Sequence, residues 1–89
     1  MNMHGNVSNE EWQIFKEAYK YFADHSNPPA SQDQNSTTWW MTAAADVTAL
    51  DQKWKEYPLM RGLLLAIYDY LSIKAKEKTK EMAEFVQEQ

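Results

Sequence analysis

The chain has 89 residues, no cysteine, and a net charge of −4 from nine basic and thirteen acidic residues. The lack of cysteine excludes disulfides, thiolate metal sites and thiol catalysis, and it favours a cytoplasmic protein. The acidic balance repels phosphate backbones, so nucleic acid is not an expected partner. With 44% hydrophobic residues and twelve aromatic ones, four Trp, five Tyr and three Phe, the composition is typical of one folded domain covering residues 1–89.

A membrane or secreted location is also not expected. The first residues lack a basic segment followed by an apolar run, so they do not form a signal peptide. The most apolar stretch, residues 63–68, is bracketed by Arg61 and Asp69 and is far too short to span a bilayer.

The first helix is predicted at about residues 8–25. Ser8 and Glu11 form an S-x-x-E sequence, in which each side chain binds a backbone amide of the other residue and so marks a helix start. The helix carries a broad apolar face of roughly 200°, formed by Trp12, Phe15, Tyr19 and Phe22 with Ile14, Ala18 and Tyr21 beside them. A face this wide is expected to touch two neighbouring elements.

A polar linker at residues 26–36 contains Pro28 and Pro29, which end the first helix. The second helix is predicted at about residues 37–55, with Ser36 or Thr37 as its N-cap.

The second helix contains two adjacent tryptophans, Trp39 and Trp40. Neighbouring side chains point about 100° apart on a helix, so these indoles form the two rims of one apolar arc whose middle is Ala43, Val47 and Trp54. We therefore expect both to belong to the packed face, and we treat them as candidate partly exposed anchors, with one indole edge left for a ligand or partner.

The third helix is predicted at about residues 58–87. Pro58 suits a first helical turn, and the short connection before it makes the second and third helices antiparallel neighbours. At 1.5 Å per residue this helix is about 43 Å long, against roughly 30 Å for the others. Its main apolar arc consists of Met60, Leu63, Leu64, Ile67, Tyr70, Leu71 and Ala75.

Two groups of apolar residues on the third helix do not fit a minimal monomer. One group lies away from the main arc, and the other lies on the overhanging last turns; together they form the candidate interaction surface of Leu59, Leu65, Ala66, Ile73, Met82, Phe85 and Val86. A soluble monomer rarely exposes so much apolar surface, so we expect a symmetric homodimer through this helix. Alternatively, the first two helices wrap the third and bury Leu65 and Ile73. The Lys and Glu residues between 74 and 84 predict a solvated helix with ion pairs three or four residues apart.

The side chains that could act in catalysis or bind a metal do not form a recognisable site in the sequence. His25 is expected at the end of the first helix, where a cation complements the helix dipole, and no carboxylate cluster is predicted beside it. Asp46 and Asp51 lie about 140° apart on the second helix, so they do not converge. With only two glycines, no phosphate-binding loop is present. We therefore expect no catalytic residues, no enzyme activity, no cofactor and no metal site.

The segment DQKWKEYPLMRGLLLAIYDYLSIKAK at residues 51–76 combines a charged helix end, Tyr-Pro-Leu and an apolar run with two tyrosines. In this layout the chain resembles a loose class of small, uncharacterised all-helical proteins encoded in prophages and mobile elements of Gram-positive bacteria. The resemblance implies a context in which small proteins act by binding host or phage proteins. It carries over no catalytic or binding residue.

The sequence therefore favours an all-α three-helix bundle that acts as a small non-catalytic protein-interaction module and self-associates. The alternative is an inhibitor that binds a host enzyme or a defence nuclease directly, for which an acidic, compact fold without cysteine is suitable. The sequence names neither the partner nor the process.

Overall fold

The computed structural model describes residues 6–87, and it describes side chains for residues 6–81. Three helices are present, α1 (Asn9–Asp24), α2 (Ser36–Lys53) and α3 (Pro58–Gln87), and no strand occurs within the described part of the chain. Each helix begins and ends within two residues of its predicted bounds. The predicted all-α fold with a long C-terminal helix is confirmed.

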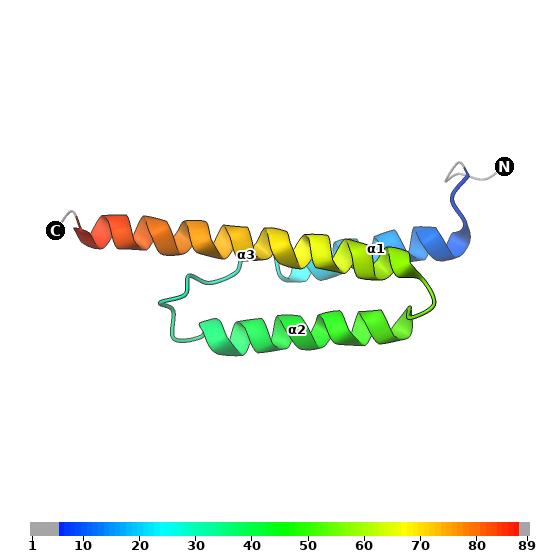
Figure 1. Ribbon diagram of the computed structural model, residues 1–89, viewed down its shortest axis with the longest axis horizontal. Coiled ribbons are helices and arrows are strands. Elements are labelled where there is room, and N and C mark those ends of the chain that lie inside the picture. Colours follow the sequence, from blue (N-terminus) through cyan, green and yellow to red (C-terminus); the bar gives the residue numbers. More distant parts are fainter. Residues whose placement is uncertain (1–5, 88–89) are drawn as a thin grey trace.

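The helices α1 and α3 pack together and run in the same direction, while α2 runs in the opposite direction against them (Figure 1). The four residues between α2 and α3 reverse the chain, as the short connection predicts. The last turns of α3 extend past the ends of both other helices (Figure 1).

The start of α1 is the predicted capping box. The Ser8 hydroxyl accepts a hydrogen bond from the Glu11 amide at 3.1 Å, and the Glu11 carboxylate accepts one from the Ser8 amide at 2.9 Å. Both bonds satisfy amides that have no partner inside the helix.

The start of α2 differs from the prediction. Asn35 is the N-cap residue, and its side chain makes no capping bond. The turn before the helix is instead closed by Asp33, whose carboxylate accepts from the Asn35 amide at 2.8 Å and whose carbonyl accepts from the Ser36 amide at 3.0 Å. Because Asp33 has already turned the chain, Ser36 is a helical residue, and neither Ser36 nor Thr37 is the cap.

The core lies where the three helices meet. It contains side chains from one face of each of α1 and α3, spaced three, four or seven residues apart, and one small residue from α2. These residues are Ile14, Ala18, Tyr21, Ala43, Met60, Leu64 and Leu71. Half-buried side chains of all three helices pack around this core, among them Trp39, Trp40 and Trp54 of the α2 arc.

The buried face of α1 differs from the sequence prediction. Ile14, Ala18 and Tyr21 are buried, whereas Trp12, Phe15 and Tyr19 are exposed. These two sets point in different directions because the exposed residues lie about 100° to 160° around the helix from Ile14. The broad face therefore does not bury all its aromatic side chains.

The segment between α1 and α2 is not a free polar linker. Pro28 and Ala30 are buried, and the segment is bound by the second half of α3. Lys74 donates to the Ser26 carbonyl, Lys78 donates to the Pro28 carbonyl at 2.6 Å, and Thr79 accepts from the Ser31 amide at 2.9 Å. Lys74 and Lys78 thus bind the linker, a role that the alternation of Lys and Glu did not predict.

Candidate functional site

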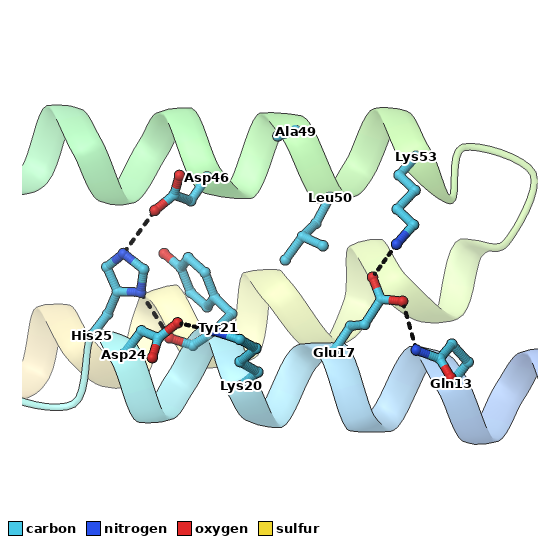
Figure 2. A pocket seen from close by; sticks show the side chains of 10 residues that line it. All are labelled: Gln13, Glu17, Lys20, Tyr21, Asp24, His25, Asp46, Ala49, Leu50 and Lys53. Atoms are coloured by element: carbon cyan, nitrogen blue, oxygen red, sulfur yellow. Dashed lines mark hydrogen bonds and ion pairs between the residues drawn. The ribbon is translucent and has the colours of Figure 1, made fainter.

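Two surfaces stand out: a polar groove between α1 and α2, and an apolar face formed by α1 and α3. Figure 2 shows the groove, which has a volume of about 510 Å³. Its walls carry charged side chains from both helices together with the apolar Ala49 and Leu50. The lining residues are Gln13, Glu17, Lys20, Tyr21, Asp24, His25, Asp46, Ala49, Leu50 and Lys53.

At one end of the groove, the Glu17 carboxylate joins α1 to α2. One of its oxygens accepts from Lys53 Nζ at 2.9 Å and from the indole nitrogen of Trp54 at 3.1 Å, and the other accepts from the Gln13 amide at 2.9 Å. Burial raises the pKa of Glu17, but these hydrogen bonds together outweigh it and hold the pKa below its usual value of 4.5. Glu17 is therefore a structural carboxylate that is kept ionised by its partners.

At the other end, His25 joins the two helices. Its Nδ1 lies 2.7 Å from the Tyr21 carbonyl oxygen, and its Nε2 lies 3.0 Å from a carboxylate oxygen of Asp46 (Figure 2). The ring also stacks on the Tyr21 ring at 4.4 Å and meets Trp39 edge-on at 5.8 Å. The sequence placed His25 at the end of the helix, where it is, but it did not predict the pairing with Asp46.

The geometry of His25 limits what it can do chemically. Both of its partners accept hydrogen bonds, so the two bonds form together only when both ring nitrogens carry protons. Neither nitrogen is then free to remove a proton from a substrate unless a bond is broken. Within the described residues, no three side chains of the types that bind metals lie together. Two polar contacts of the groove therefore connect α1 to α2, that of Glu17 with Lys53 and that of His25 with Asp46.

The second surface is the face of α1 and α3 that points away from α2, called here the outer face. It carries Phe15 (48% exposed) and Tyr19 (70%) from α1 and Tyr70 (48%) and Ile73 (46%) from α3. Trp12, with 45% of its surface exposed, lies on the same side of α1. The rings of Phe22 and Tyr70 lie 6.0 Å apart across the two helices, so the apolar surface is continuous between them.

The predicted interaction surface is only partly the one that the structure exposes. Leu65 is 61% exposed, Ala66 and Ile73 are exposed, and Leu59 is half-buried. The arrangement in which α1 and α2 bury Leu65 and Ile73 is therefore wrong. The side chains of the remaining three predicted residues, Met82, Phe85 and Val86, lie outside those described.

The two candidate anchors are part of the packed arc, as predicted. Trp39 and Trp40 are half-buried against the core, with ring centroids 4.7 Å apart, and Trp40 meets Tyr68 of α3 at 5.2 Å. Asp46 and Asp51 also diverge as predicted. Asp46 contacts His25 at the end of α1 at 3.0 Å, whereas Asp51 pairs with Arg61 of α3 at 3.0 Å.

Sequence reasoning missed the contribution of α1 to the outer face. It assigned Phe15 and Tyr19 to the buried side because both lie in one broad apolar arc. One signal in the sequence pointed the other way. Ala18 lies between Ile14 and Tyr21 in a row three to four residues apart, and a small residue in such a row lets a neighbouring helix approach closely.

The chain matches no protein-family model, no curated protein and no solved structure. Within residues 6–87, no helix combines the length and the apolar character needed to cross a membrane.

Proposed function

We propose that this chain is a small, non-catalytic, cytoplasmic protein-interaction module that binds its partner through the outer face of α1 and α3. The observation that carries the proposal is the exposure of Phe15, Tyr19 and Tyr70 on one continuous surface. Aromatic side chains are enriched at the centres of protein interfaces, where they supply much of the binding energy.

The size of the surface supports the same function. A large aromatic side chain contributes 150–250 Å² when fully covered, so the exposed parts of Trp12, Phe15, Tyr19 and Tyr70 together amount to roughly 400 Å². That area is comparable with the largest apolar patch on a typical monomer, and such patches are often functional. The polar groove, by contrast, has its charged groups paired with one another, which is typical of a structural contact.

The biological context that we propose is the binding of a host or phage protein, as the resemblance of residues 51–76 to small prophage and mobile-element proteins implies. In that context, a partner that is a structural protein indicates assembly, and a partner that is a nuclease or another enzyme indicates inhibition.

The proposal is tested by site-specific photocrosslinking in cells that express the chain. A benzophenone amino acid replaces Tyr19 on the outer face and, as a matched control, Thr48, which is exposed on α2. We expect covalent protein adducts from position 19 and few or none from position 48. Equal adduct yields at both positions, or none at position 19, would show that the outer face is not a binding surface.

A further inference from the structure

The two helices of the outer face carry side chains of different size near the level of Phe15. The α1 side has large rings, those of Phe15 and Tyr19. The α3 side carries Tyr70 and Ile73 further along the helix, but before them it contains Gly62 and Ala66, both exposed, and a Cβ added at Gly62 would meet no atom within 4 Å. The rings of α1 in one copy would therefore pack better on the small residues Gly62 and Ala66 of α3 in another copy than on a second row of rings.

Two contacts show which residues of α1 and α3 lie at the same level along the bundle axis. One contact is made by α1 itself and the other by the segment that follows it. The Phe22 ring meets that of Tyr70, and Lys74 binds the Ser26 carbonyl, so a residue of α1 lies level with the residue 48 positions later in α3. Phe15 is thus level with the short surface segment between Gly62 and Ala66. An α1 placed in register on the α3 of another copy would bring its Phe15 to that segment.

Over the length of α3 that lies beside α1, the two edges of the outer face carry opposite charges. Lys16 is exposed at the α1 edge and Asp69 is exposed at the α3 edge, and neither forms an ion pair with any other described residue. By the same register, Asp69 lies five residues, or about 7.5 Å, beyond the level of Lys16. The other nearby lysine of α1, Lys20, is already paired with Asp24 at 2.8 Å.

From these observations we infer that the partner of the outer face is a second copy of this chain, aligned in parallel about a two-fold axis along the helices. In this dimer α1 of each copy covers α3 of the other, and Lys16 of each copy faces Asp69 of the other. The inference rests on the proposed function, because it names the occupant of the same surface. The exposed rings alone supply roughly 400 Å² of the about 800 Å² that each partner buries in an interface of standard size.

The alternative two-fold axis, perpendicular to the helices, places α1 on α1 and α3 on α3. Rings then lie on rings, and the Lys16 edge of one copy lies along the Lys16 edge of the other. The charge pattern and the size pattern therefore both favour the parallel dimer.

A charge-reversal cycle tests the arrangement. The wild type, Lys16→Glu, Asp69→Lys and the double variant are compared by sedimentation equilibrium over micromolar concentrations, with circular dichroism to confirm that each is folded. We expect a wild-type mass of twice 10.5 kDa. Either single reversal should raise the dimer dissociation constant about tenfold, because each dimer contains two exposed Lys16–Asp69 pairs and both become repulsive. The double variant should restore the wild-type dissociation constant.

A second pair of variants tests the surface itself. Tyr19→Glu should give a folded monomer, and the matched control Thr48→Glu, on the exposed side of α2, should leave the dimer intact. Three results would overturn the inference: a wild-type mass of 10.5 kDa at the highest concentration, a dimer that Tyr19→Glu leaves unchanged, or single reversals that weaken the dimer without rescue in the double variant. In each of these cases, crosslinks from position 19 to a different protein would still support the proposed function.

Discussion

At the scale of single residues, Tyr21 connects α1 to α2 through a buried hydroxyl. The hydroxyl donates to the Ala43 carbonyl at 3.1 Å. We expect Tyr21→Phe to lower the free energy of unfolding by about 1 kcal/mol, because it removes one hydrogen bond and leaves the ring packing in place. Urea denaturation at neutral pH measures the loss. Tyr57→Phe, a change at an exposed tyrosine, is the control and should have little effect.

The same hydroxyl makes stability depend on pH at alkaline values. Burial raises the pKa of Tyr21 from 10.0 to about 12, and the negative charges that Tyr68 and Asp46 can carry add to the shift. Since the folded state holds this proton more tightly than the unfolded state, the contribution is present below pH 10 and is lost as the pH rises through 12.

We therefore expect the wild type to lose up to about 1.4 kcal/mol of stability per pH unit from this group in that window. Tyr21→Phe should lose less over the same range. Identical alkaline profiles for the two proteins in urea denaturation would contradict the assignment.

Glu17 gives a prediction at acidic pH. Its pKa lies below 4.5 because hydrogen bonds from Gln13, Lys53 and Trp54 outweigh the effect of burial. Its contribution to stability is therefore fully present above pH 4.5 and is lost as the pH falls through the lowered pKa. We expect Glu17→Gln to cost about 1 kcal/mol at neutral pH, and we expect the difference from the wild type to shrink as the pH falls below 4.5.

Chemical denaturation across this pH range measures the Glu17 effect. Asp24→Asn is a suitable comparison, because its pair with Lys20 is exposed and such pairs contribute little to stability. A difference between wild type and Glu17→Gln that stays constant with pH would show that the charge of Glu17 is not involved.

At the scale of the helices, the N-terminal ends of α1 and α2 are stabilised in different ways. The start of α1 depends on the Ser8 side chain, whereas α2 follows a turn held by Asp33 and has no side-chain cap. We expect Ser8→Ala to cost about 1 kcal/mol. The matched change Ser36→Ala should stay within about 0.5 kcal/mol, because Ser36 caps nothing.

Thermal or urea unfolding of the two alanine variants decides this comparison. Equal losses at Ser8 and Ser36 would mean that Ser36 does cap α2 in solution, as the sequence alone suggests.

At the scale of the whole molecule, the structure decides which side of α1 is the core. Ile14 is fully buried, whereas Tyr19 is 70% exposed. We expect Ile14→Ala to lower the free energy of unfolding by about 2 to 5 kcal/mol, and Tyr19→Ala to change it by less than about 0.5 kcal/mol in a dilute, monomeric sample.

How the stability change of Tyr19→Ala depends on protein concentration tests whether the outer face is covered by a second copy. If the outer face is covered by a second copy, Tyr19→Ala should become destabilising as the protein concentration rises, because dimerisation stabilises only the wild type. A large loss for Tyr19→Ala at every concentration would instead place this side of α1 in the core of the monomer.

Local signals in the sequence determined the helices of this protein. The capping box at Ser8, the two prolines after Asn27 and Pro58 act on backbone groups within a few residues, so the helix bounds follow from them closely. The divergence of Asp46 and Asp51 also follows from the helical repeat alone. For the same reason, the exposure of Leu65 and Ile73, away from the main arc of α3, agrees with their predicted position.

Only the tertiary structure decided how the faces are used. The apolar arc of α1 is wide enough to be buried on either of two sides, and the positions of α2 and α3 select the row of Ile14, Ala18 and Tyr21. The pairing of His25 with Asp46 and the binding of the linker by Thr79 join residues far apart in the sequence. Helical periodicity gives the direction of each side chain about the axis of its own helix. It does not say which neighbouring element lies in that direction.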